Sequence, residues 1–98
     1  DLCSVANVVF PSVTFAEKDG TFTNINGIVQ KINRAVSPPG WAKPDLEILG
    51  GIAKAEGKPF DSLEPDKVMD EIAKNVKSFE NVSYDKLGET GIKIEYAE

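Results

Sequence analysis

The 98-residue chain contains no histidine and a single cysteine, Cys3. Without imidazole, the chain has no catalytic pair of the Ser-His or Cys-His kind and no zinc site of the usual Cys/His kind. It also lacks the side chain that most often serves as a general base. A lone cysteine cannot form a disulfide within the chain, and without a neighbouring histidine it is usually an unreactive thiol. The sequence therefore excludes most enzyme mechanisms for these residues and favours a reducing, cytoplasmic compartment.

Long apolar runs and an excess of basic residues are also lacking. The apolar runs, such as Val8-Val9-Phe10, are only a few residues long, whereas a helix needs roughly 20 apolar residues to cross a bilayer. Lysine and arginine number 11 against 16 aspartates and glutamates, which gives a net charge of −5. We therefore expect no membrane span and no nucleic-acid partner.

The remaining composition is that of an ordinary globular protein. Hydrophobic residues make up 41% of the chain and charged residues 28%, enough apolar surface for one small core but not for two domains. Because the first residue is Asp1 rather than methionine, we expect residues 1–98 to be a single fragment of a longer polypeptide. Neighbouring parts of that polypeptide would then cover some of its surface.

Three stretches predict β-strands. Residues 5–13 contain the β-branched and aromatic run before Pro11, residues 28–36 alternate imperfectly with a period of two, and residues 92–96 alternate cleanly. Between the first two stretches, residues 14–26 are mostly polar or small, and Asp19-Gly20 predicts a turn. These stretches indicate a β-hairpin or a short sheet.

Two main helices and a short third helical turn are predicted after the strands. Pro44 opens the first helix, which extends to Ala55 or Glu56, and the second covers residues 65–76, with a capped turn at residues 83–88. Gly50-Gly51 in the first helix indicates the close approach of another backbone. The two helices are expected to share a core formed by Leu46, Leu49, Ile52, Val68, Met69, Ile72 and Val76. Together these elements predict a small α+β domain.

The polar loop offers the main candidates for chemistry outside the helices. Glu17 and Asp19 have the residue types of an acid–base or metal-binding pair. Two carboxylates beside Lys18 in such a loop more often accept backbone N–H groups, and we expect Glu17 to fix the loop in this way. We therefore predict no catalytic residue and no metal ligand in this chain.

The order and spacing of several motifs resemble the molybdopterin oxidoreductase family. The resemblance is carried by Val8-Val9-Phe10-Pro11, by Phe15-Ala16-Glu17-Lys18-Asp19-Gly20-Thr21-Phe22-Thr23-Asn24, by Gly27-Ile28-Val29-Gln30, by Pro38-Pro39-Gly40 and by Pro44-Asp45. It continues through Val82-Ser83-Tyr84-Asp85-Lys86-Leu87 to about Ile94. Within the family, the chain is most similar to formate dehydrogenase alpha subunits and to the related large subunit of NADH:quinone oxidoreductase, an NADH dehydrogenase.

This resemblance implies an oxidoreductase as the parent protein. The parent would take part in electron transport with iron–sulfur clusters and with molybdopterin guanine dinucleotide holding Mo or W. The fragment itself would be structural and cofactor-supporting, would hold no cofactor alone and would be inactive in isolation. Its partners would be the remaining domains of the parent subunit and other subunits of a redox complex, in the cytoplasm or at the inner face of a membrane.

Asp45 is the one cofactor-binding residue that the resemblance implies. It matches a family aspartate expected to recognise the guanine end of the pterin dinucleotide, and a carboxylate can accept two N–H donors from guanine. The alternative is a plain negative charge in the first turn of a helix. If the role holds, Asp45 should be exposed with a free carboxylate. For the whole chain, the alternative function is a stand-alone, non-catalytic protein-binding module.

Overall fold

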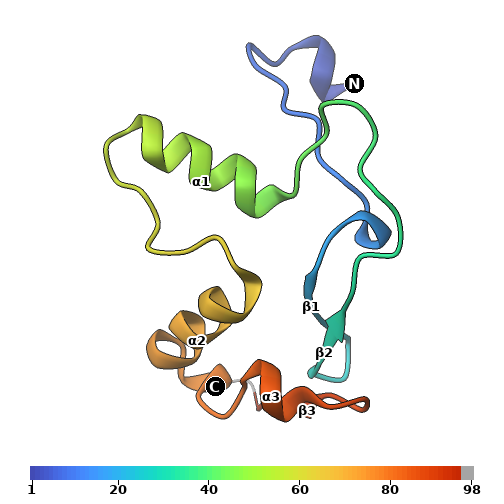
Figure 1. Cartoon of the computed structure of the whole chain (residues 1–98), viewed down its shortest axis with the longest axis vertical. Helices are drawn as coiled ribbons and strands as arrows, with labels where there is room; N and C mark the ends of the chain where they lie inside the picture. Colours follow the sequence, from blue (N-terminus) through green and yellow to red (C-terminus); the bar gives the residue numbers. More distant parts are fainter. Residues whose placement is uncertain (96–98) are drawn as a thin grey trace.

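The structure is a computed structural model of the chain and describes residues 1–95 (Figure 1). It has an α+β fold, as predicted, in which a three-stranded sheet is combined with three α-helices. The helices are α1 (Asp45–Ala55), α2 (Pro65–Asn75) and the short α3 (Tyr84–Leu87), and three 3-10 turns are η1 (Leu2–Ser4), η2 (Phe15–Glu17) and η3 (Lys77–Phe79). In Figure 1, α1 lies above α2, and the β1–β2 hairpin lies to their right.

The sheet is antiparallel and has the order β1-β2-β3, with β1 at Gly20–Thr23, β2 at Ile28–Ile32 and β3 at Ile92–Lys93. The tip of the β1–β2 hairpin is formed by residues 24–27. The side-chain oxygen of Asn24 accepts the N–H groups of Asn26 and Ile28, and Gly27 has a positive φ of 74°, a conformation that glycine adopts without steric cost. The predicted turn at Asp19-Gly20 is therefore wrong, because Gly20 begins β1.

Two of the three predicted strands are confirmed in part, and one is wrong. The strand over residues 28–36 is confirmed as far as Ile32, and the terminal strand is confirmed at Ile92–Lys93, while Tyr96 lies outside the described residues. The strand predicted over residues 5–13 is wrong, because the only pairing there is an isolated parallel bridge between Ser12 and Lys43. A β-branched run forms a strand only where a neighbouring strand pairs with it, and β1 occupies the edge of the sheet beside β2.

Both main helices agree with the sequence to within one residue at each end. Pro44 directly precedes α1, and Pro65 is the first residue of α2, where a missing N–H group is tolerated. A lysine lies in the last turn of each helix, where its positive charge interacts favourably with the negative end of the helix dipole. The third turn ends at Gly88, whose φ is 53°.

The buried core lies between the sheet, α2 and α3. Its members are Val29, Met69, Val82, Leu87 and Ile94. Because α1 contributes no side chain to this core, the predicted core shared by the two helices is wrong. Of its seven residues only Met69 is buried, and Leu49, Ile52 and Val76 are 55%, 44% and 44% exposed. Periodicity identified the apolar face of each helix correctly, but α2 packs against β1 and η3, leaving much of the apolar face of α1 uncovered.

Gly50 explains how α1 is attached near its middle. A Cβ atom at this position would lie 2.4 Å from Cδ2 of Leu63, so any larger residue would displace the Leu63 side chain. The glycine thus admits a side chain from the α1–α2 connection, not another backbone as predicted. A Cβ atom added at Gly51 would meet none of the atoms described for residues 1–95 within 4 Å.

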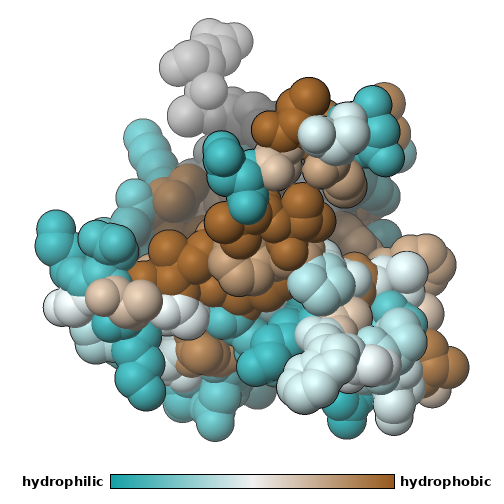
Figure 2. Space-filling model, turned by 90° about the horizontal axis from the view of Figure 1, so that it is seen from above, coloured by the Kyte–Doolittle hydropathy of each residue, from teal (hydrophilic) through white to brown (hydrophobic). Residues whose placement is uncertain are grey.

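The surface retains a large amount of exposed apolar area. Figure 2 shows hydrophobic residues across the middle of one face, bordered by hydrophilic ones. The large exposed hydrophobic residues come mostly from the N-terminal stretch and from α1 and its connection to α2: Leu2, Val5, Val8, Val9, Phe10, Phe15, Leu49, Ile52, Phe60 and Leu63. Patches of this kind usually mark surfaces that contact other polypeptide. No helix within residues 1–95 is long and apolar enough to cross a membrane.

The position of the core predicts very different costs for two leucine truncations. Leu87 is 1% exposed, so Leu87→Ala should lower the free energy of unfolding by about 2 to 5 kcal/mol. The matched control Leu49→Ala on the exposed face of α1 should cost less than about 1 kcal/mol. Urea unfolding followed by circular dichroism measures both, and equal losses would contradict this placement of the core.

Candidate functional site

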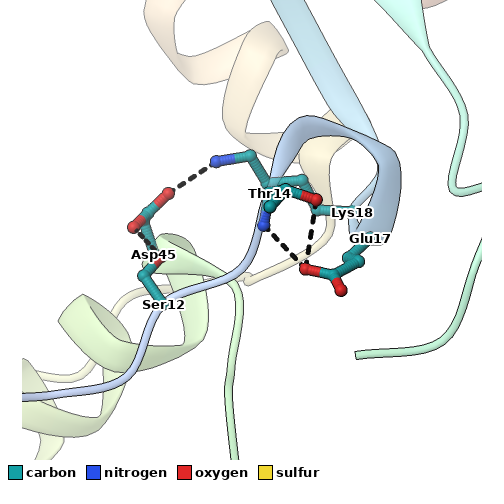
Figure 3. A network of polar contacts seen from close by, with 5 residues as sticks. All are labelled: Ser12, Thr14, Glu17, Lys18 and Asp45. Atoms are coloured by element: carbon teal, nitrogen blue, oxygen red, sulfur yellow. Dashed lines mark hydrogen bonds and ion pairs between the residues drawn. The ribbon is translucent and has the colours of Figure 1, made fainter. Parts of the chain in front are cut away.

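Three segments that are distant in the sequence meet at the N-terminus of α1 (Figure 3). The ammonium group of Lys18 donates to Oδ2 of Asp45 at 2.6 Å, and the hydroxyl group of Ser12 donates to Oδ1 of the same carboxylate. We call Ser12, Lys18 and Asp45 the Asp45 cluster. Both oxygens of Asp45 therefore have a hydrogen-bond partner within the chain.

The η2 turn places Lys18 in this cluster. Oε2 of Glu17 accepts the backbone N–H of Thr14 at 2.8 Å and its hydroxyl group at 3.1 Å (Figure 3). This arrangement is a capping box, which satisfies backbone groups at the start of a helical turn. The predicted structural role of Glu17 is confirmed, since its carboxylate binds a loop N–H. Lys18 follows directly and its side chain extends to α1.

Ser12 and Asp45 are brought together by the backbone. Ser12 forms a parallel bridge with Lys43, and the N–H of Lys43 donates to the carbonyl oxygen of Pro11 at 3.1 Å. Pro44 then separates this bridge from Asp45, the first residue of α1. A carboxylate in the first turn interacts favourably with the helix dipole, so the backbone alone already favours a negative charge here.

The cluster keeps Asp45 ionised. Its pKa is lowered below the ordinary value of 3.8, chiefly by the hydrogen bond from Lys18 and next by that from Ser12. The carboxylate is therefore a pure hydrogen-bond acceptor at neutral pH. The Asp45 side chain is 57% exposed, whereas Lys18 is only 23% exposed. Solvent thus reaches Asp45 more freely than it reaches its lysine partner.

This geometry corrects one expectation about Asp45. The residue is exposed at the start of a helix, as predicted, but its carboxylate is not free. Like the carboxylate of Glu17, that of Asp45 is bound within the chain. No local pattern indicated the contact with Lys18, since 27 residues separate the two side chains.

Asp19 does not form a pair with Glu17. Its Oδ1 accepts the backbone N–H of Arg34 at 3.0 Å, which joins the start of β1 to the segment that follows β2. Glu17 is occupied by Thr14. Within residues 1–95, moreover, no three or more side chains of histidine, cysteine, aspartate or glutamate are grouped so that they could hold a metal ion. The acid–base or metal interpretation of Glu17 and Asp19 has no geometric support.

A cavity of about 220 Å³ adjoins the cluster. Lys18, Asp19 and Asp45 form part of its wall, and Leu46 of α1, apolar residues of α2 and Tyr84 form much of the rest. The Tyr84 hydroxyl is buried and has no hydrogen-bond partner among residues 1–95, and burial raises the pKa of this group. Lys31 lies 5.3 Å above the ring. Sequence reasoning found only a helical turn here and missed Tyr84.

Comparison with known proteins gives a consistent family. A sequence model described as molybdopterin oxidoreductase matches residues 1–55, which include η2, the β1–β2 hairpin, α1 and the whole Asp45 cluster. The F420-dependent formate dehydrogenase 1 subunit alpha of Methanococcus maripaludis is 39% identical over 94 residues, which are 94% of this chain and 14% of that protein.

Two staphylococcal proteins are also similar. A protein of Staphylococcus haemolyticus named "Putative formate dehydrogenase" is 44% identical over 82 residues, or 84% of this chain and 8% of that protein. A protein of Staphylococcus aureus strain USA300 with the same description is 40% identical over the same shares of the two chains. The chain thus spans 8% to 14% of the length of these relatives.

The lowered pKa of Asp45 predicts a specific loss of stability in acid. A carboxylate whose folded pKa lies below its unfolded value stabilises the fold above pH 3.8, and this contribution disappears as the pH falls through the folded pKa. Between pH 5 and pH 3, the wild-type chain should therefore lose more stability than Asp45→Asn. The difference should be at most about 1 kcal/mol, because solvent screens this exposed group. Lys18→Met should reduce the pH dependence as well. Urea unfolding at each pH tests this, and identical pH profiles for all three proteins would contradict it.

Proposed function

The chain belongs to the molybdopterin oxidoreductase family, and from this premise we propose that it forms part of a formate dehydrogenase that uses a pterin cofactor. The observation that carries the proposal is the match of residues 1–55 to the family, together with relatives whose names describe formate dehydrogenases. These names favour formate dehydrogenase over the second candidate, the large subunit of NADH:quinone oxidoreductase. They also favour it over a stand-alone protein-binding module.

Asp45 is the residue that we propose to contact the cofactor, at its guanine end. Guanine offers two adjacent donors, the ring N–H and the exocyclic amino group, and an ionised carboxylate offers two acceptor oxygens. Ser12 and Lys18 each donate one hydrogen bond to a different oxygen, so each oxygen retains accepting capacity. With 57% of the side chain exposed, the donor set of guanine fits this site.

The rest of the chain would support that contact. When bound, molybdopterin guanine dinucleotide would supply a Mo or W centre for the oxidation of the substrate. The residues of this chain would orient one end of the cofactor: α1 carries Asp45, and the capping box at Glu17 places Lys18 beside it. Electrons would pass to iron–sulfur clusters held by other parts of the enzyme.

The setting of the proposed enzyme follows from the same premise. Its remaining domains and other subunits of a redox complex would be the partners of this chain, and the exposed apolar residues of α1 and the N-terminal stretch support such contacts. We place the enzyme in the cytoplasm, or at the inner face of a membrane as part of a complex. A net charge of −5 disfavours nucleic acid as a partner.

The first test is the pterin content of the larger enzyme that contains this chain. Asp45→Asn should leave folding near normal but lower the pterin content per folded subunit, because an amide offers one acceptor where two are needed. Asp61→Asn is the matched control, since Asp61 is also exposed but lies in the α1–α2 connection. Unchanged pterin content in Asp45→Asn would leave Asp45 as a helix-start charge worth at most about 1 kcal/mol.

A second test concerns the chain on its own. The purified 98-residue protein should show no turnover of formate or NADH, because it offers no histidine and no sequence motif for a flavin or nicotinamide cofactor. Formate-dependent reduction of an artificial dye measures this sensitively. Turnover by the metal-free chain would disprove the assignment of this chain as structural and cofactor-supporting.

A further inference from the structure

We propose that Lys18 and Ser12 are positioning residues that make Asp45 selective for guanine over adenine. This inference rests on the proposed guanine site and assigns a role to the two side chains behind it. Neither side chain needs to touch the base. Their task is to hold the Asp45 carboxylate in one orientation before a ligand arrives.

The hydrogen bonds provide the first support. An aspartate side chain rotates about two bonds, and a single donor would leave the carboxylate free to turn. Ser12 and Lys18 donate to different oxygens of Asp45, so rotation in either direction breaks one contact. The two donors come from positions 33 and 27 residues before Asp45. The orientation is therefore set by the tertiary fold and not by the first turn of α1.

The burial of the partners provides the second support. Lys18 is 23% exposed, against 72% for Lys74 in the ion pair with Glu71. The Lys18 contact is also shorter, at 2.6 Å against 3.7 Å. A partly covered, charge-assisted hydrogen bond is shorter and stronger than a solvated ion pair. Lys18 is thus held in place, while Asp45 keeps the larger exposed fraction for a ligand.

Base chemistry turns this fixed orientation into selectivity. Guanine presents two neighbouring donors along the edge that carries its amino group, whereas adenine presents a donor beside a ring acceptor. A fixed, ionised carboxylate accepts hydrogen bonds from both donors of guanine. Against adenine, one carboxylate oxygen would accept from the amino group, but the other would face the ring acceptor, and two acceptors cannot bind each other. A mobile carboxylate would have to be ordered during binding, at a cost that lowers affinity by about tenfold. Removing Lys18 should therefore reduce guanine binding much more than adenine binding.

The experiment titrates GMP and AMP into the 98-residue chain and follows the backbone amide signals at the start of α1 by NMR. The unaltered chain should prefer GMP. Lys18→Met should weaken GMP binding about tenfold and change AMP binding less than twofold. Lys18→Arg should restore the preference, because arginine keeps the charge and the donor. Lys54→Met is the matched control, since Lys54 is an exposed lysine in the last turn of α1, far from Asp45 in the helix. This variant should bind GMP and AMP as the unaltered chain does.

One further variant, Asp45→Asn, separates this inference from the proposed function when it is compared with Lys18→Met. Loss of GMP binding in Asp45→Asn with unchanged binding in Lys18→Met would retain the guanine site and overturn the positioning role. No preference for GMP in the unaltered chain, or no effect of Asp45→Asn, would overturn both. Equal losses for GMP and AMP in Lys18→Met would also overturn the positioning role and assign Lys18 to the phosphate.

Ser12→Ala keeps the inference testable if Lys18→Met fails to fold. It removes one neutral donor and leaves the ion pair in place, so it should weaken GMP binding by a smaller factor of roughly two to five. Circular dichroism confirms folding for each variant. If Lys18→Met does not fold, an unchanged GMP affinity in folded Ser12→Ala would overturn the proposal.

Discussion

The contact of Asp45 with Lys18 and Ser12 links α1 to the rest of the molecule. The buried core lies between the sheet, α2 and α3 and includes no side chain of α1. Polar contacts hold the first residue of α1, and Leu63 lies against Gly50 near its middle. The position of Asp45 therefore depends on the same hydrogen bonds that lower its pKa.

This division has consequences for local stability. Exposed ion pairs contribute about 0 to 1 kcal/mol, whereas a buried leucine contributes several times more. The sheet, α2 and α3 should accordingly form the more stable unit, and α1 should open at lower cost. Contacts of α1 with other parts of the proposed enzyme would add to its stability, and its exposed residues Leu49 and Ile52 offer apolar area for them. The proposed cofactor contact thus lies on the less firmly held part of the chain.

The sequence predicted local features better than the contacts between elements. Proline positions and apolar periodicity located α1 and α2 closely, because these signals act within a few residues. The strand over residues 5–13 was wrong because strand formation depends on a partner that the local sequence does not specify. The shared helical core failed for a similar reason: periodicity identifies an apolar face but not the element that covers it.

In the candidate site, too, the sequence predicted the local features and missed the contacts between distant residues. Pro44-Asp45 placed a carboxylate at a helix start, and Glu17 was correctly expected to hold its own loop, since both depend on nearby residues. The contact between Lys18 and Asp45 and the buried Tyr84 hydroxyl arise only when distant segments meet. No spacing rule connects such positions, so the polar partners of Asp45 required the folded structure.

The electrostatics of the Asp45 cluster also determine how the site responds to its surroundings. The chain contains no histidine, the only side chain whose ordinary pKa lies between pH 5 and 8. The pKa of Asp45 is lowered further from that range by Lys18 and Ser12. A ligand with two adjacent donors would therefore meet the same charged acceptor throughout physiological pH. Added salt should weaken the Lys18–Asp45 ion pair less than it weakens the Lys74–Glu71 pair, because Lys18 is less exposed to solvent than Lys74. The charge of Asp45 is thus constant over this pH range, and Asp45 is not a pH switch.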